Sequence, residues 1–240
     1  MIYFVFENKF FYWCYFCRKN FPKIILFLLI SISLSGCKIN FEGDVYTSDI
    51  IDVFDENSTI FIPMQISFQV SSCDEDLNDL HNELTNYFSE YQYMSCDQGS
   101  DFMSYATSKV KVPIAPSQES FDSSYNLVGY LVQEFDDGKY VFMTLNKTLF
   151  NSLNNYVEAE TFQKLSLEES KVAIKIYNDM DFVHLTVFPS FVDGIPIIYE
   201  TEYELEKRET LNILSSEVGA AHLEYNWWTP IFKFIDTHDL

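Results

Sequence analysis

Apolar and polar residues alternate most regularly in Ile60–Val70, where every second side chain is hydrophobic. A period of two predicts a strand that buries one face. Acidic residues 74–76 then lead into apolar residues at helical spacing, which predicts a helix after this strand. Asp136-Asp137-Gly138-Lys139 lies between two apolar runs and is typical of a hairpin. Residues 149–157 again show helical spacing, and Asn146 or Thr148 can cap the short helix that this spacing predicts.

The second half of the chain favours strands almost throughout. Asp193-Gly194 between two apolar runs is a strong hairpin signal. The segments expected to be strands are Val172–Tyr177, Phe182–Val192, Ile195–Leu205, Glu209–Leu214 and Ile231–Ile235. We therefore predict an α+β fold class, in which an N-terminal strand-helix layer is followed by an antiparallel β meander or a small sandwich.

Residues 1–36 have the features of an export signal. Arg18, Lys19 and Lys23 precede the apolar run Ile24–Leu34. This run is about half as long as the ~20 apolar residues that a membrane-spanning helix needs, and it suits the core of a signal peptide. An uncleaved anchor and a buried core helix are the alternatives. We predict that residues 1–36 are removed, and a long aromatic region before the run suggests that translation starts nearer Lys19.

The tetrad Leu34-Ser35-Gly36-Cys37 closes this run and resembles the lipobox of bacterial lipoproteins. The resemblance implies that the Cys37 thiol receives a diacylglyceryl group and that a peptidase cuts before it. Two or three acyl chains hold a protein firmly, because each buried methylene contributes ~0.8 kcal/mol. Lys38 stands where an Asp favours retention in the inner membrane in Gram-negative sorting. The resemblance thus implies a membrane partner through lipid on Cys37, at the outer membrane facing the periplasm rather than at the inner membrane.

The remaining chain is expected to have three parts. Residues 37–58 should form the lipidated N-terminus and a tether that docks partly onto the body. Residues 59–165 should form an α+β domain, and residues 166–240 an antiparallel β domain.

Acidic residues outnumber basic ones by 36 to 15, which gives a net charge of −21. Residues 1–36 hold four basic residues and one acidic residue, so their removal takes the net charge to −24. Nucleic acids and anionic headgroups are bound through clustered Lys and Arg. The charge therefore argues against nucleic acid as a partner and fits a basic partner or plain solubility.

Cys73 and Cys96 are the other two cysteines of the exported chain. An oxidising compartment predicts that they form a disulfide. The Cα atoms of such a pair lie within about 7 Å, whereas a helix from Asp74 to Tyr93 would be ~30 Å long. The helix should therefore stop near Ser89, and the following residues should return along it as an extended segment.

Catalytic and metal-binding motifs are missing from the sequence. The histidines do not have zinc-site spacing, and neither a nucleophile elbow nor a Gly-rich phosphate loop is present. We predict no metal, no cofactor and no enzymatic activity. Glu200, Glu202, Glu204 and Glu206 share one face of a strand. They are interpreted as a solvated edge that discourages aggregation, with a docking stripe for a cation or a basic protein as the alternative.

Trp227 and Trp228 form an aromatic cluster with Tyr225. Such a cluster either closes the end of a β core or offers a platform to a sugar or a peptide. Several segments also resemble an uncharacterised family of small bacterial envelope lipoproteins, some of them encoded near mobile elements. Those segments are residues 35–38, 41–44, 46–50, 72–74, 191–196 and 218–221.

This second resemblance implies a shared location and fold, and it carries no catalytic residues. The leading hypothesis is a lipid-anchored, non-enzymatic protein that binds another envelope or surface protein. The alternative is a glycan- or peptide-binding lipoprotein that uses the patch of Tyr225, Trp227 and Trp228.

Overall fold

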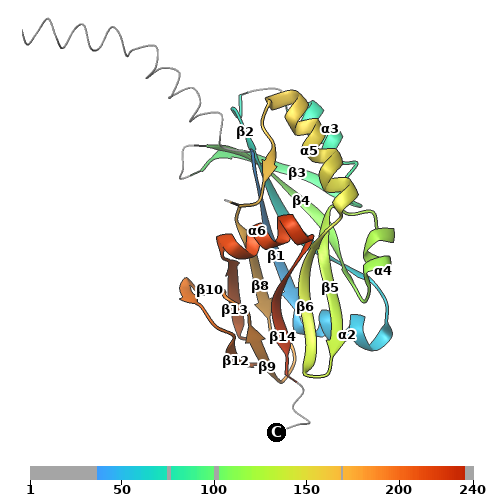
Figure 1. Cartoon of the computed structure of the whole chain (residues 1–240), viewed down its shortest axis with the longest axis vertical. Coiled ribbons are helices and arrows are strands. Elements are labelled where there is room, and N and C mark those ends of the chain that lie inside the picture. The colour runs from blue at the N-terminus through green and yellow to red at the C-terminus, as the bar shows by residue number, and fades with distance from the viewer. Residues whose placement is uncertain (1–36, 75–76, 100–102, 169, 236–240) are drawn as a thin grey trace, which may run out of the picture. The chain divides into compact units, whose positions relative to one another are not determined.

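The computed structural model describes residues 37–74, 77–99, 103–168 and 170–235. The predicted signal peptide, residues 1–36, lies outside these described residues. The structure is mostly β, with 50% strand and 25% helix. Figure 1 shows a strongly bent sheet with helices placed around it.

In the part of the chain that the structure describes, fourteen strands form one sheet. The strands of the first half are β1 (Cys37–Tyr46), β2 (Ile60–Val70), β3 (Tyr91–Gln98), β4 (Ser104–Ala115), β5 (Val128–Phe135), β6 (Gly138–Leu145) and β7 (Leu165–Ser166). Those of the second half are β8 (Val172–Tyr177), β9 (Phe182–Val187), β10 (Ser190–Val192), β11 (Ile195–Ile197), β12 (Thr201–Glu206), β13 (Thr210–Ser215) and β14 (Trp228–Phe234).

The sheet curls back on itself until it is nearly closed. Its main path has the order β11-β10-β13-β8-β1-β2-β4-β5-β6-β14-β9-β12, while β3 pairs with β4 and β7 pairs with β1. Residues 188–189 alone join β9, near one end of the path, to β10, near the other end. A connection this short requires the two ends to lie close together.

Strand β1 unites the two halves of the chain. Its residues alternate between the core and the outer face, with Ile39, Phe41 and Val45 inside. β1 pairs antiparallel with β2 and parallel with β8, where Phe41 lies opposite Val172. Strands from both halves therefore belong to one sheet.

Five helices are present in the described ranges: α2 (Thr47–Glu56), α3 (Asn78–Leu84), α4 (Gln118–Ser123), α5 (Lys147–Thr161) and α6 (Glu217–Asn226). Helix α2 packs against β1, β4 and β5, and α6 packs against β6, β13 and β14. Figure 1 shows α3 and α5 at the end of the sheet opposite α2. The hydroxyls of Tyr87, just after α3, and Ser152 of α5 are 3.2 Å apart.

One large apolar core fills the inside of the curved sheet. Phe41, Tyr130 and Phe232 are among its largest fully buried side chains. A smaller cluster on the outer face contains Ala115, Phe121, Leu131 and Phe142. Because α4 brings Phe121 to this cluster, β5 is buried on both faces along Val128–Val132.

The predicted α+β class is wrong. The expected N-terminal strand-helix layer and the expected β meander are parts of a single mixed sheet of mostly β structure. The physical reason is the parallel pairing of β1 with β8, which joins segments far apart in the chain. Periodicity reports which face of a strand is buried, but it does not report which strand lies beside it.

The expected domain limits also differ from the structure. The described residues from Cys37 to Ile235 form one compact unit. The segment expected to be a tether, residues 37–58, contains β1 and α2, and buried Ile50 and Val53 of α2 belong to the core. The expected boundary after Leu165 falls inside β7, which pairs with β1.

Candidate ligand-binding groove

Trp227 and Trp228 line a groove of about 510 Å³. Its walls come from α4 and Tyr125, from the N-terminus of α5, and from the junction of α6 with β14. Ligand pockets in proteins usually measure about 300–1,000 Å³. The groove therefore has the size of a ligand site, and aromatic residues form part of its wall.

The two tryptophans have different environments. Trp228 is 43% exposed, and its ring packs edge-on against Phe142 and His222, with centroids 5.5 Å and 4.9 Å away. Trp227 is partly buried against the core, and its ring centroid is 5.9 Å from that of Phe150. Trp227 thus anchors the groove to the core, while Trp228 presents aromatic surface to solvent.

Two aromatic residues of the groove have a left-handed backbone conformation. Tyr125 and Trp227 have φ angles of 55° and 69°. This left-handed region costs a bulky residue about 1–2 kcal/mol, and residues held there cluster at functional sites. Trp227 ends α6, where its amide donates to the carbonyl of Leu223 at 2.9 Å. Tyr125 is 64% exposed, so burial of its ring does not offset this cost.

Polar side chains complete the groove. Gln118 donates from Nε2 to Oδ1 of Asp122 at 2.9 Å, which fixes an amide and a carboxylate side by side. The Asn146 carboxamide oxygen accepts from the first amides of α5, and Lys147 Nζ lies 5.3 Å from the centroid of Trp227. Asn226 also lines the groove. Together these groups can stack on a flat apolar face and hydrogen-bond to hydroxyl or amide groups around it.

The third residue of the predicted patch lies elsewhere. Tyr225 is 80% exposed on α6, and it is not part of the groove wall. The tyrosine that lines the groove with Trp227 and Trp228 is Tyr125, which follows α4 and is distant in the sequence. No local pattern connects these residues, so sequence reasoning did not find Tyr125.

Cys37 is the first residue of β1 and is 8% exposed. Its amide donates to the carbonyl of Lys164 at 2.9 Å. Its Sγ lies 3.4 Å from Oε1 of Gln163 and 3.7 Å from Oγ1 of Thr161. Burial raises the pKa of the thiol, and the hydrogen bond with Thr161 only partly opposes this effect. As a free thiol, Cys37 would therefore be a poor nucleophile.

A family model described as a domain of unknown function, DUF7424, matches residues 39–237. The chain belongs to the DUF7424 family. The match begins two residues after Cys37 and spans the sheet described above. No curated protein and no solved structure matches the chain.

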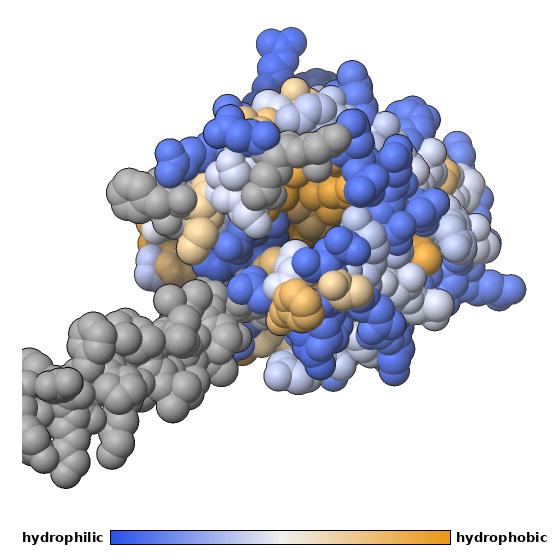
Figure 2. All heavy atoms as spheres, turned by 90° about the horizontal axis from the view of Figure 1, so that it is seen from above, coloured by the Kyte–Doolittle hydropathy of each residue, from blue (hydrophilic) through white to orange (hydrophobic). Residues whose placement is uncertain are grey.

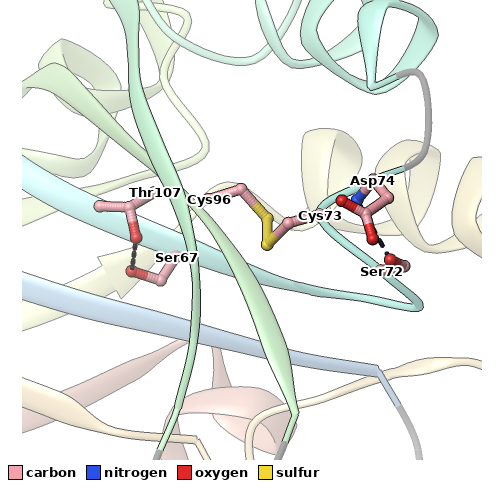
Figure 3. The surroundings of a disulfide bond; sticks show 6 residues. All are labelled: Ser67, Ser72, Cys73, Asp74, Cys96 and Thr107. Atoms are coloured by element: carbon pink, nitrogen blue, oxygen red, sulfur yellow. Dashed lines mark hydrogen bonds between the residues drawn. A yellow bond between two sulfur atoms is a disulfide. The ribbon is translucent and has the colours of Figure 1, made fainter.

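The DUF7424 domain contains the disulfide predicted between Cys73 and Cys96, with Cα atoms 5.5 Å apart (Figure 3). Cys73 lies just after β2 and Cys96 lies on β3. The helix ends at Leu84, earlier than the expected stop near Ser89, and β3 forms the expected extended return toward Cys73. Among the described strands β3 pairs with β4 alone, so the disulfide gives this outer strand a second attachment to the sheet.

The acidic strand lies at an end of the sheet path. Glu202, Glu204 and Glu206 of β12 are exposed, and Oε1 of Glu204 is 3.9 Å from Nδ1 of His184. Glu200 precedes the strand, with Oε2 3.9 Å from Nζ of Lys233. Since β12 is the last strand of the path, this position fits a charged edge that resists pairing with another chain.

The hairpin of β10 and β11 and the residues just after it expose apolar side chains of the DUF7424 domain. Ile195, Ile198 and Tyr199 are 67%, 73% and 75% exposed. Phe191 of the same hairpin lines a second groove of about 550 Å³ on the outer face of β1, β2 and β8. Nζ of Lys171 in that groove lies 2.6 Å from Oε1 of Glu42. The surface therefore combines exposed apolar residues with charged residues.

Proposed function

We propose that this DUF7424 protein is a lipid-anchored protein of the bacterial envelope, held at the outer membrane through Cys37 and facing the periplasm. The lipobox-like tetrad that ends at Cys37 supports this proposal. No helix in the described ranges is long and apolar enough to cross a membrane. Labelled palmitate should enter the wild type and be absent from Cys37→Ala. Incorporation by the variant would contradict anchorage at this residue.

The activity that we propose is non-enzymatic binding of a carbohydrate in the groove of Tyr125, Trp227 and Trp228. One observation carries the proposal: three aromatic residues line the same groove as Gln118, Asp122, Asn146, Lys147, Thr148 and Asn226. Sugar rings present apolar faces and a rim of hydroxyls. Aromatic rings can cover such faces, and amide, carboxylate and ammonium groups can bind the hydroxyls.

Two substitutions test the groove. Trp228→Ala and Tyr125→Ala each remove exposed aromatic surface, so each should weaken binding at least about tenfold. The melting temperature should change little in Tyr125→Ala, whose ring is mostly exposed, and should fall only moderately in Trp228→Ala, which loses ring contacts with Phe142 and His222. Calorimetric titration with envelope polysaccharide fragments measures the affinity, and circular dichroism measures the melting temperature.

Tyr225→Ala is the matched control. It removes an exposed tyrosine close in sequence to the groove but outside its wall, so the affinity should not change. A Trp228→Ala variant that melts earlier but still binds would indicate a purely structural role. Binding of peptides with no binding of sugars would replace the carbohydrate proposal with the peptide alternative.

A second candidate function is binding of another envelope protein, as the sequence first suggested. The exposed Ile195, Ile198 and Tyr199 favour it, because large apolar side chains exposed within one short segment are typical of a protein interface. A photo-crosslinking residue in place of Ile198 should capture the same partner repeatedly in intact cells. The same residue in place of Asp136, an exposed turn position, should not. Repeated failure at Ile198 would count against this candidate.

A further inference from the structure

Phe162 is an exposed aromatic residue at the end of α5. Its side chain is 92% exposed, and its φ of 58° lies in the left-handed region. Glycine or asparagine usually occupies such a position after a helix. A phenylalanine at this position carries two costs. Its backbone is in a conformation that bulky residues rarely adopt, and its apolar ring is exposed to water. An apolar partner that covers Phe162 would account for this arrangement.

The neighbours of Phe162 identify that partner, because they touch Cys37. Thr161 and Gln163, on either side of Phe162, both contact the Cys37 sulfur. Lys164, which accepts the Cys37 amide hydrogen bond, is exposed. No spacer separates Cys37 from the body, since β1 begins at this residue.

We infer that the body rests directly on the membrane that holds the anchor, with Phe162 inserted beside the lipid on Cys37. The inference depends on the proposed lipidation of Cys37. A lipid bonded to this sulfur starts within contact distance of Thr161 and Gln163, so the bilayer surface must lie close to Phe162. Phenylalanine transfers favourably into lipid, and the Lys164 side chain can reach headgroups while its stem stays on the protein.

The contact is a local one. Figure 2 shows the end of the body that carries α3 and α5: its surface is largely hydrophilic, with hydrophobic residues gathered in a central hollow. The body should therefore sit at the headgroups without sinking into the hydrocarbon. The aromatic groove is at the opposite end of α5, and the 15 residues of this helix span about 22 Å. Membrane contact at Phe162 thus leaves the groove open to ligand.

A fluorescent probe at position 162 tests this contact. Full-length Phe162→Cys is expressed in cells that process lipoproteins, purified in detergent and labelled with an environment-sensitive nitrobenzoxadiazole (NBD) dye. If Cys37 is lipidated and Cys73 and Cys96 are paired, one dye attaches per chain. The protein is reconstituted into vesicles of phosphatidylcholine, with or without bromine on the acyl chains. Asp136→Cys, in the exposed turn between β5 and β6, is the control.

The dye at position 162 should shift to shorter wavelength and lose most of its fluorescence in brominated vesicles. The dye at position 136 should show neither change, because this turn lies at the α2 end of the sheet, where Lys139 Nζ is 4.0 Å from the centroid of Phe54. Vesicles that carry the protein but leave position 162 unquenched would overturn the contact and leave the anchor intact. Protein that neither floats with vesicles nor takes up palmitate would overturn the anchor itself, and the contact with it.

Discussion

Replacing Gly43 with alanine tests how closely the middle of the sheet packs against the core. A Cβ atom at this position of β1 would overlap the hydroxyl oxygen of Tyr130 and lie 3.2 Å from Cε of Met64. Tyr130 is fully buried, and its hydroxyl has no hydrogen-bond partner among the described residues. The glycine and this unpaired hydroxyl therefore occupy one tightly packed site.

The magnitude follows from this geometry. Overpacking of a core costs about 1–3 kcal/mol, so Gly43→Ala should lower the free energy of unfolding by that amount. Tyr130→Phe should leave it unchanged or raise it, because burial of an unpaired hydroxyl costs about 1–3 kcal/mol. Without the hydroxyl, the new Cβ lies 3.6 Å from a ring carbon at position 130, which is ordinary contact. Its tighter contact is with Cε of Met64, the end of a flexible side chain that can move aside. Gly43→Ala should then cost little, so the two substitutions are coupled by about 1–3 kcal/mol.

Urea denaturation of the wild type, the two single variants and the double variant measures this coupling. Fluorescence of Trp227 and Trp228 reports unfolding without a further label. Additive effects in the double variant would refute the proposed overlap. A large loss of stability in Tyr130→Phe would show instead that the hydroxyl makes a stabilising hydrogen bond.

Three further predictions concern stability. Burial alone would raise the pKa of Asp179, but hydrogen bonds from Ser48 and Thr47 at the start of α2 hold it below its ordinary value. Asp179→Ala should therefore cost about 1 kcal/mol in urea denaturation at pH 7, and this difference should vanish as the pH falls below about 3.9 through the lower folded pKa. Replacing Cys73 and Cys96 with serine should lower the free energy of unfolding by about 3 kcal/mol. Reduction of the wild-type disulfide should lower the melting temperature by the same amount as this double substitution does. Asn146→Ala should cost about 1 kcal/mol through lost capping of α5, measured in urea.

Residues close together in the sequence were enough to predict several elements correctly. Strand β2 has the bounds that its alternation predicts, Ile60–Val70. Helix α5 begins directly after Asn146, whose side-chain oxygen accepts from two amides of the first turn. Asp193 and Gly194 form the predicted turn, both with positive φ, between β10 and β11. In each case residues close in the sequence decide the conformation.

Strand β1 and helix α6 were missed although their signals are present. Ile39, Phe41 and Val45 alternate with polar residues and are typical of a strand, but their place after the anchor suggested a tether. Before α6, the Ser216 side chain accepts from the Gly219 amide at 3.2 Å, which is an ordinary helix start. This helix buries only Ala220 and Leu223, so it has no clear apolar stripe to reveal it.

The arrangement of strands and the groove could not be read from periodicity, because both depend on long-range pairing. The adjacent Trp227 and Trp228 attract attention in the sequence, whereas Tyr125 lines the same groove because β5, β6 and β14 pair side by side. The same sheet links the groove to the proposed anchor, since β1, which starts at Cys37, lies inside the strand path. A lipid on Cys37 would therefore be attached to the rigid body itself and not to a flexible tether. The orientation of the groove at the membrane is then set by the fold, so membrane contact at Phe162 and ligand binding at Trp228 can be tested independently in one reconstituted protein.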